Sequence, residues 1–571
     1  MMNFKKNIYA ISIVAASAVV LGVAGCGITP QDEGLGAASS KAVSGIVVDG
    51  YLAGATVFID VNENNRLDAW EERALTDTSG YYSYNPVTGI NYCELAPTDA
   101  KYIHCLKSPA GYDEVMIRMR GGYDLATVEP FVGTISMKMN VSSVVLDTPV
   151  AATPITGLMS EMTAEEQATF LALEGISAEG AVSDFMDFAN SITETERRNL
   201  LGLALKAHKI ADVVASLIDV EFDQGTVSGG SPEGGFFGVA SGVPVDGSVY
   251  VYRAMVQQML SSNTALSTIL SDLTRLTAVV ERTKVEIAEG AIQQYNDKLA
   301  IDEDTGLIAA TETALLAPST IDAAGHAALA IKIAQTVDAV FANSLDVTDK
   351  DTLQADILSR MRATDVVVSL TRDGEAANIV DNAVSLASDP TYLANLALPS
   401  ADLASLKKKF AAQPGLVVAS DADFSGRQPF SALLVSDAGS AFTATDGSEV
   451  NTAGFAGNTL ALNNTPSDQS AGSDEVSVSF QGDTPDATGG DLTIDATLLG
   501  GDFAKKDANG NPEPLSLTGT WEKVDDYTMI MNIEVTAGVF EPVIVKPNET
   551  GGYYFDLGGE QVVWGGGAAT P

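Results

Sequence analysis

The stretch SGIVVDGYLAGATVFID, residues 44–60, alternates apolar residues with small or polar ones and is interrupted by glycine and aspartate. This pattern is typical of short strands joined by tight turns. Three further runs of the same kind follow, namely ALTDTSGYYSY (74–84), VMIRMRGGYDL (115–125) and GTISMKMNVSSVVL (133–146). We therefore predict a small β-sandwich module over residues 43–150.

A polar loop follows the first strand pair, in FIDVNENNRLDAWEE, residues 58–72. With Asp60 as position 1, side-chain oxygens fall at positions 1, 3, 5, 9 and 12, on Asp60, Asn62, Asn64, Asp68 and Glu71. Arg66 at position 7 would offer its backbone carbonyl. This is the ligand spacing of an EF-hand calcium loop, although Asn65 replaces the usual glycine at position 6 and a strand precedes the loop. The sequence predicts bound Ca²⁺; the alternative is a polar turn without metal.

The strands around this loop resemble the carboxypeptidase-regulatory-like and collagen-adhesin B-type modules of bacterial surface proteins. The resemblance rests on a G-x-V-x-D…L-x-G-A-x-V strand pair followed by a T-D-x-x-G-x-Y strand. The matching residues are Gly45, Val47, Asp49, Leu52, Gly54, Ala55, Val57, Thr76, Asp77, Gly80 and Tyr82. It covers residues 43 to about 85 and implies a spacer or display module, in which some members hold calcium in an Asp/Asn-rich loop.

The beginning of the chain has the features of a secretory signal peptide over residues 1–25. Lys5 and Lys6 precede an apolar stretch, and small residues lead into Cys26. The sequence VAGC resembles the lipobox of bacterial lipoproteins, which implies cleavage before Cys26 and attachment of acyl chains such as palmitate. An uncleaved membrane anchor is the alternative. Residues 26–42 then form the lipidated end and a Gly- and Ser-containing tether.

The formal net charge of −43 restricts the classes of partner. Nucleic acid and anionic lipid would both repel such a chain, so we expect contact with a membrane only through the lipid anchor. In the lipoprotein family, Asp after the lipidated cysteine favours the inner membrane, and Gly27 therefore indicates the outer membrane. We expect exposure at the cell surface, with the periplasmic face left open.

Apart from Cys26 the chain contains only Cys93 and Cys105. An even pair that closes a short loop in an exported protein predicts a disulfide. The alternative is a metal site formed by these cysteines and His104, which lacks a fourth ligand and a recognisable zinc spacing.

Residues 160–412 are rich in Ala, Leu and charged residues at helical spacing, which predicts an α-helical domain with a Gly-rich loop at 228–247. A seven-residue stripe predicts one long helix; its members are Met259, Leu266, Leu273, Val280 and Ile287, with Ile269 and Leu276 between them. The stripe is expected to form the core of a helical bundle or an oligomerisation seam, so the oligomeric state stays open.

Residues 413–571 return to short apolar runs separated by Gly, Asn, Asp and Pro, and predict a C-terminal β-sandwich or jelly-roll. Its aromatic residues could stack on sugars or fill a core; they are Trp521, Tyr527, Tyr553, Tyr554 and Trp564. The whole chain is thus expected to be a multidomain α+β protein.

No nucleophile elbow, zinc-protease motif, phosphate loop or dinucleotide fingerprint occurs in the sequence. We therefore predict a non-enzymatic, lipid-anchored surface protein that acts in adhesion, surface structure or ligand display. Its partner would be a surface polysaccharide or another surface protein. The alternative is a glycan-binding accessory or glycan-active hydrolase that uses the C-terminal domain.

Overall fold

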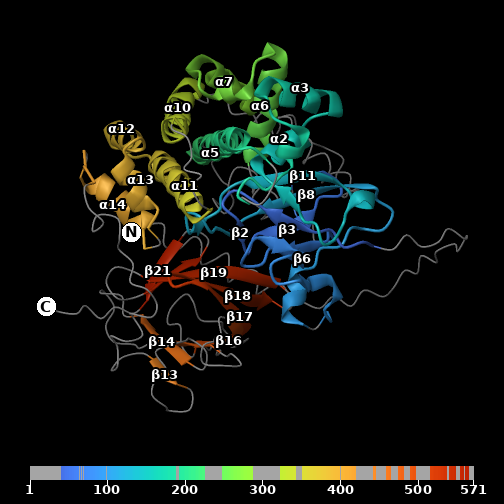
Figure 1. The fold of residues 1–571 in the computed structure, drawn as a ribbon. Helices are drawn as coiled ribbons and strands as arrows, with labels where there is room; N and C mark the ends of the chain where they lie inside the picture. Colours follow the sequence, from blue (N-terminus) through green and yellow to red (C-terminus); the bar gives the residue numbers. More distant parts are fainter. Residues whose placement is uncertain are drawn as a thin grey trace, which may run out of the picture. The chain divides into compact units, whose positions relative to one another are not determined.

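The chain is a multidomain α+β protein, as the sequence predicts, and the computed structural model divides it into two compact units within Ser40–Ser425 and Gly426–Pro571 (Figure 1). The structure describes residues 40–63, 65, 67, 70–97, 99–187, 192–224, 247–286, 322–342, 350–398, 400–413, 415–418, 442–444, 458–464, 474–480, 489–496, 515–536, 539–547, 553–557 and 560–564. The predicted signal peptide, Cys26, the tether up to residue 39 and the Gly-rich loop up to residue 246 lie outside these ranges.

Two small sheets form the N-terminal part of the first unit. One runs in the order β11, β8, β3, β4, with bounds Thr134–Asn140, Glu114–Arg120, Thr56–Ile59 and Arg73–Leu75. The other runs β12, β1, β5, with bounds Val150–Ala152, Gly45–Val47 and Tyr81–Tyr82. Side chains of both sheets, including Val47, Ile117 and Ile135, share one buried core. This pairing of two sheets around one core agrees with the predicted sandwich.

Smaller strand pairs complete this region. A three-stranded sheet runs β10, β9, β2, with bounds Glu129–Pro130, Tyr123–Asp124 and Leu52–Ala53, and a hairpin joins β6 (Tyr84–Asn85) to β7 (Ile90–Asn91). The described residues of this region also form short 3-10 helices, η1 (Tyr92–Glu94), η2 (Ala100–His104) and η3 (Val141–Ser143).

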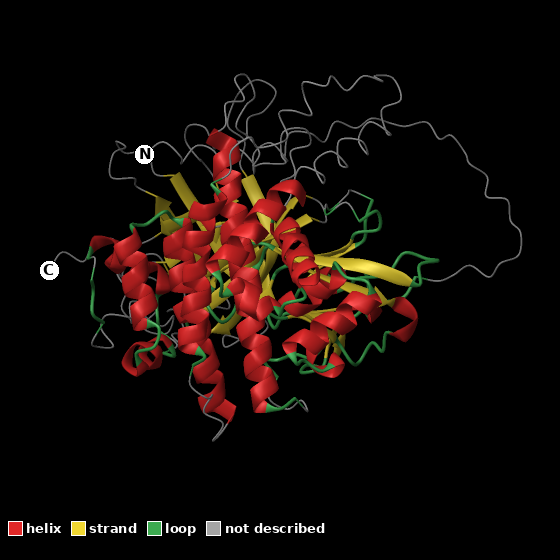
Figure 2. Cartoon of the chain, turned by 90° about the horizontal axis from the view of Figure 1, so that it is seen from above, coloured by secondary structure: helices red, strands yellow, loops and turns green. Residues whose placement is uncertain are grey.

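The helical part starts directly after β12. Thr153 caps the first helix by accepting from the backbone N–H groups of Ile155 and Thr156, and Pro154 occupies the first helical position. The helices are α2 (Pro154–Ser160), α3 (Ala164–Glu174), α4 (Ala178–Ala181), α5 (Glu194–Gln224), α6 (Ser248–Ser262), α7 (Leu266–Leu270), α10 (Ala323–Val340), α11 (Lys350–Arg372), α12 (Ala377–Leu386), α13 (Pro390–Leu396) and α14 (Leu403–Ala412). The long helices α5, α10 and α11 pack against one another (Figure 1), and Figure 2 shows the long helices of this unit side by side from above.

The β-sandwich and the helices share a hydrophobic core, whereas the sequence suggested two separate domains at 43–150 and 160–412. Val47 of β1 faces the interior of the sandwich. Its neighbours Ile46 and Val48 point the other way and pack with Ala151 in the core that the helices build. An apolar run without alternation is expected of a strand that is covered on both faces. The run GIVV therefore explains why the two regions form one unit.

The predicted long helix with a heptad stripe is interrupted. Asn263 has a φ of 45° and ends α6 in a left-handed turn, after which α7 and a further helical stretch at residues 273–286 follow. A seven-residue spacing keeps to one face only while the helix is continuous. Most of the stripe is nevertheless buried, as a bundle core requires, namely Met259, Leu266, Ile269, Leu276 and Val280. Leu273, however, is 47% exposed, so its assignment to the core was wrong.

The described strands of the second unit form a single antiparallel sheet, whereas the sequence predicts a sandwich or jelly-roll. Its strands follow sequence order and are β13 (Phe442–Ala444), β14 (Asn458–Asn464), β15 (Asp474–Phe480), β16 (Gly489–Ala496), β17 (Leu515–Asp525), β18 (Thr528–Thr536), β19 (Val539–Pro547), β20 (Tyr553–Leu557) and β21 (Glu560–Trp564). Each strand pairs with the next one along the chain, the arrangement that short connections favour. The sequence located the strands, but strand spacing alone does not distinguish a single sheet from two.

Candidate functional site

The predicted calcium loop begins at Asp60, directly after β3. A side-chain oxygen of Asp60 accepts a hydrogen bond from the backbone N–H of Asn65 at 2.9 Å. Asn65 has a φ of 63°, in the left-handed region, at the position where an EF-hand loop needs glycine for a sharp turn. Asn is among the residues that best tolerate this conformation, so the substitution at position 6 fits the loop.

The other end of the loop is held by Glu71, at position 12. Its carboxylate accepts from the backbone N–H of Val61 at 2.8 Å, and it is 7% exposed. The backbone N–H of Ile59 also donates to the carbonyl of Glu72 at 3.0 Å. The pairing of β3 with β4 therefore closes residues 60–71 into a loop, which explains why strands rather than helices flank it.

A buried guanidinium lies next to the first predicted ligand. Arg118 Nε is 2.5 Å from Asp60 Oδ2, and Arg118 Nη1 donates to the Ser136 hydroxyl at 2.8 Å. This ion pair neutralises part of the charge that Asp60 would offer to a cation. The Arg118 pairing had no counterpart in the sequence interpretation, because Arg118 belongs to a strand more than fifty residues further along the chain.

Only part of the predicted ligand set can be placed. Asn62 is exposed, and Asn64, Arg66 and Asp68 lie outside the described residues. Among the residues that are described, no group of three or more His, Cys, Asp or Glu is arranged to hold a metal ion. Asp60 and Glu71 supply hard oxygen donors of the type that Ca²⁺ requires, so the donor chemistry at the two loop ends fits the predicted ion.

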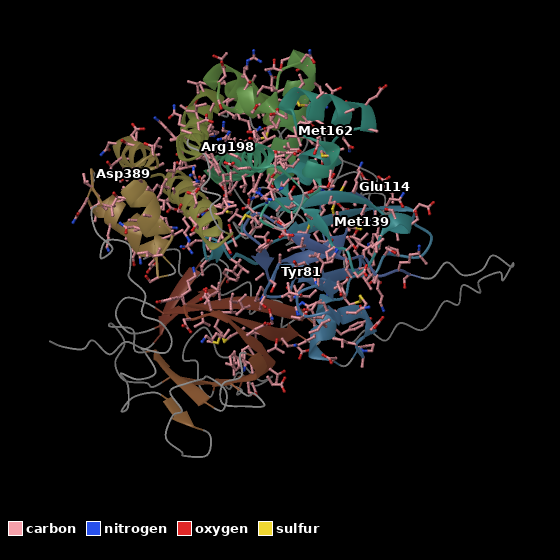
Figure 3. All side chains as sticks on the ribbon, in the orientation of Figure 1. Tyr81, Glu114, Met139, Met162, Arg198 and Asp389 are labelled. Carbon is pink, nitrogen blue, oxygen red and sulfur yellow. A yellow bond between two sulfur atoms is a disulfide. The ribbon has the colours of Figure 1, made fainter. Side chains whose placement is uncertain are left out.

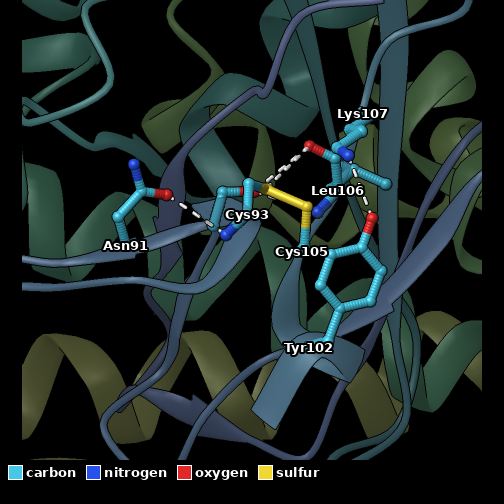
Figure 4. Close-up of a disulfide and its surroundings, with 7 residues drawn as sticks. Asn91, Cys93, Tyr102, Cys105, Leu106 and Lys107 are labelled. Carbon is cyan, nitrogen blue, oxygen red and sulfur yellow. Dashed lines mark hydrogen bonds between the residues drawn. A yellow bond between two sulfur atoms is a disulfide. The ribbon is translucent and has the colours of Figure 1, made fainter. Parts of the chain in front are cut away.

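A disulfide joins Cys93 and Cys105, in agreement with the sequence prediction (Figure 4). Cys93 lies in η1 and Cys105 follows η2, with their Cα atoms 4.8 Å apart. His104 does not take part in the alternative metal site. Its Nδ1 lies 2.9 Å from the carbonyl oxygen of Leu75, and because a carbonyl can only accept, Nδ1 carries the hydrogen. Burial lowers the pKa of His104, which keeps the ring neutral.

The T-D-x-x-G-x-Y residues serve the fold. The Asp77 carboxylate accepts from the backbone N–H groups of Ser79 and Tyr81 through one oxygen, and from Asn85 Nδ2 and the Tyr92 hydroxyl, both at 2.7 Å, through the other. Gly80 has a φ of 84°, which favours glycine. This motif therefore builds a turn and offers no reactive group.

A buried ionic cluster lies where the sandwich meets the helices, and the sequence interpretation missed it. Lys209 of α5 donates to Asp49, which follows β1, with Nζ and Oδ2 2.8 Å apart. Asp365 of α11 lies 4.0 Å from the same ammonium. Asp124 of β9 is close enough to Asp49, Lys209 and Asp365 to interact with all three charges. Three acidic side chains thus surround one basic side chain in the joint core, the hydrophobic core that the β-sandwich and the helices share.

The carboxyl groups of this cluster differ in the direction in which their pKa values are shifted. Burial raises the pKa of Asp49, but the charges of Lys209 and His208, together with the hydrogen bond from Lys209, outweigh it and hold that pKa below its ordinary value. Burial, together with the Asp49 charge, raises the pKa of Asp124 to about 7. Burial also raises the pKa of Asp365, against the opposing effect of Lys209. Asp49 Oδ1 and Asp124 Oδ2 are both buried and accept no hydrogen bond from any described residue. Asp124 is therefore a carboxyl group of the cluster that exchanges a proton near neutral pH.

One feature of the sequence could have pointed to this cluster. Asp49 interrupts the apolar segment IVVDG, and Lys209 lies within a helix of small and apolar residues. Charged side chains inside apolar runs are rarely buried unless they are paired. The local sequence indicates a turn at Asp49, and no periodicity in the chain links this residue to a lysine 160 residues later.

The structure also places His208 and two of the aromatic residues that the sequence suggested could stack on sugars or fill a core. His208 is buried, stacks on Phe131 with ring centroids 4.8 Å apart and contacts the Tyr252 hydroxyl through Nδ1 at 2.9 Å, as a packing residue would. Trp521 is buried and Tyr527 is half-buried. The side chains of the other three aromatic residues, Tyr553, Tyr554 and Trp564, are not among those that the structure describes.

Among the described helices, none combines the length and the apolarity needed to cross a bilayer. No family model, no curated protein and no solved structure matches this chain.

Proposed function

We propose that the protein is a lipid-anchored surface protein of the bacterial outer membrane with a non-enzymatic role in adhesion, surface structure or ligand display. Its N-terminal β region is stabilised by calcium. Cys26 carries the lipid, and residues 27–42 separate it from the folded unit. A surface polysaccharide or another surface protein is the partner, and the strongly acidic chain does not bind nucleic acid.

The observation that carries the calcium part is the way in which the described residues of loop 60–71 are held. Asp60 and Glu71 at its two ends both accept hydrogen bonds from the loop backbone, and Asn65 supplies the left-handed turn between them. Such a loop brings backbone and side-chain oxygens toward its centre. The disulfide between Cys93 and Cys105 supports an exported protein, because structural disulfides persist in oxidising compartments.

The anchor is tested by metabolic labelling. In a bacterium that processes lipoproteins, the wild-type chain should incorporate labelled palmitate, and Cys26→Ala should abolish the label and leave a larger precursor. The variant removes the only sulfur in the lipobox and leaves the disulfide pair intact. A wild-type chain without label would contradict the lipid anchor.

The calcium site is tested by calorimetry on the full chain without its signal peptide, because the sandwich shares its core with the helices. An extracellular module with a Kd of about 10⁻⁴–10⁻³ M would gain roughly 0.4–1.4 kcal/mol at about 1 mM calcium. Magnesium should add less, because it dehydrates reluctantly and demands octahedral geometry. Glu71→Gln should remove most of the calcium-dependent rise in Tm.

Glu72→Gln is the matched control, since Glu72 is the exposed neighbour with the same charge. It should retain the full response to calcium. Equal melting temperatures with calcium and with chelator in the wild-type chain would show that the loop is a polar turn, and the calcium part of the proposal would be abandoned.

A further inference from the structure

A pocket of about 320 Å³ opens between helices α3, α5, α7 and α10, far along the chain from the calcium loop. It lies entirely within the first unit. Pockets that hold small molecules range from about 300 to 1,000 Å³, so this one suits a ligand at the small end of that range. Its walls combine apolar side chains with four charged ones.

Gly202 in the interior of α5 leaves room in this pocket. A glycine in a helix interior costs about 1 kcal/mol relative to alanine, which calls for a physical reason. Close packing does not provide one, because a Cβ atom at Gly202 would meet a single atom, Cγ1 of Val337, at 4.0 Å. The space in front of Gly202 is therefore open, and a side chain there would occupy the pocket.

Two of the four charged groups satisfy each other. Lys206 forms an ion pair with Asp338, and it also donates to the Ser271 hydroxyl at 2.9 Å. The Ser271 hydroxyl lies 3.1 Å from the carbonyl oxygen of Ser267 and 3.2 Å from the Asp338 carboxylate, and it can donate its one hydrogen to either. This closed set fixes one wall of the pocket and leaves little charge for a ligand.

The other two charged groups, Arg198 and Glu174, are available. Arg198 is half-buried on α5 (Figure 3), and no described residue forms an ion pair with it. Glu174 at the end of α3 accepts only from the backbone N–H of Ser267, at 3.2 Å, which leaves its negative charge uncompensated by any described side chain. The pocket thus offers one cation and one anion beside the apolar surface of Val337 and Phe341.

We propose that this pocket binds a free α-amino acid with an apolar side chain. The ligand carboxylate pairs with the Arg198 guanidinium, whose planar fork matches a carboxylate. The ligand ammonium pairs with Glu174. The apolar side chain lies in the space in front of Gly202, against Val337 and Phe341. This inference does not depend on the lipid anchor or on calcium.

Titration calorimetry with the full chain without its signal peptide tests the proposal. L-phenylalanine or L-leucine should bind at millimolar or lower concentration. N-acetyl-L-phenylalanine, which lacks the ammonium, and L-phenylalaninamide, which lacks the carboxylate, should each bind at least about tenfold more weakly, because a lost charged hydrogen bond leaves its partner unsatisfied. Arg198→Gln and Glu174→Gln should cause losses of the same size.

Gly202→Leu should abolish binding by filling the pocket, and it should keep or raise the Tm because leucine favours a helix more than glycine does. Ala172→Leu, at an exposed position of α3 that does not line the pocket, is the matched control and should bind like the wild type. The proposal fails if neither amino acid binds the wild-type chain. It also fails if either derivative binds as tightly as L-phenylalanine, or if Gly202→Leu binds normally.

Discussion

Lys209→Met should lower the free energy of unfolding by about 3–5 kcal/mol, measured by denaturant unfolding near neutral pH. The substitution keeps the length and apolar stem of the side chain but removes the ammonium that Asp49 contacts at 2.8 Å. Asp49 is 1% exposed, so its carboxylate would be left charged in the joint core without a cation. A buried charge that loses its partner is far more costly than the pair was favourable.

Lys332→Met provides the matched control. Lys332 forms an ion pair of similar geometry with Asp381, at 2.6 Å, but that carboxylate is 53% exposed. Water can replace the lost partner there, so the loss should be about 0–1 kcal/mol. The double variant Lys209→Met with Asp49→Asn should recover part of the loss, because it removes both charges. Equal effects of Lys209→Met and Lys332→Met would mean that the cluster is accessible to water.

In the β region, local sequence patterns predict a strand, a turn and a disulfide. The run GIVV, the turn at Asp77 and the pair of cysteines each involve residues that lie close together in sequence, and the structure places a strand, a tight turn and a disulfide there. Local propensity and short loop closure decide such features, so a single sequence contains the information. The same is true of the left-handed turn at Asn65.

The features that the sequence did not predict depend on contacts between distant segments. Arg118 reaches Asp60 from the neighbouring strand β8, 58 residues further along the chain, and Lys209 reaches Asp49 from a helix 160 residues away. Helical periodicity can indicate that a face is buried, but it cannot identify which charged residue lies opposite. The break at Asn263 illustrates a second limit, because a left-handed residue ends the helix, so the later positions of an apparent heptad stripe no longer share one helical face and Leu273 becomes exposed.

The order of the C-terminal strands has a similar explanation. Alternation along β17 or β18 identifies a strand, while the choice of neighbours is a property of the whole sheet. A meander and a sandwich can arise from strands of equal length and spacing. The candidate ligand pocket was not predicted for the same reason, since Arg198, Glu174 and Val337 come together only when three helices pack.

Asp124→Asn should flatten the dependence of stability on pH. The ordinary pKa of this carboxyl is 3.8, and the folded protein raises it to about 7 through burial and through the charge of Asp49. Because the folded state binds the proton more tightly, the stability that neutral Asp124 provides is fully present below about pH 4 and is lost as the pH rises through about 7. Between about pH 5 and pH 8 the wild-type chain should lose roughly 2–3 kcal/mol through this group.

Asp49, Lys209 and Asp365 also face Asp124, and because all three are present in both chains, the comparison between the variant and the wild type isolates the effect of residue 124. Asn keeps an oxygen that can accept from the backbone N–H of Ala126, which the aspartate does at 2.7 Å. Its amide can in addition donate within a cluster in which Asp49 Oδ1 accepts no bond from a described residue. The exposed Asp113→Asn serves as a control and should leave the slope unchanged. A variant whose unfolding free energy falls between pH 5 and pH 8 as steeply as that of the wild type would mean that Asp124 stays ionised in the core.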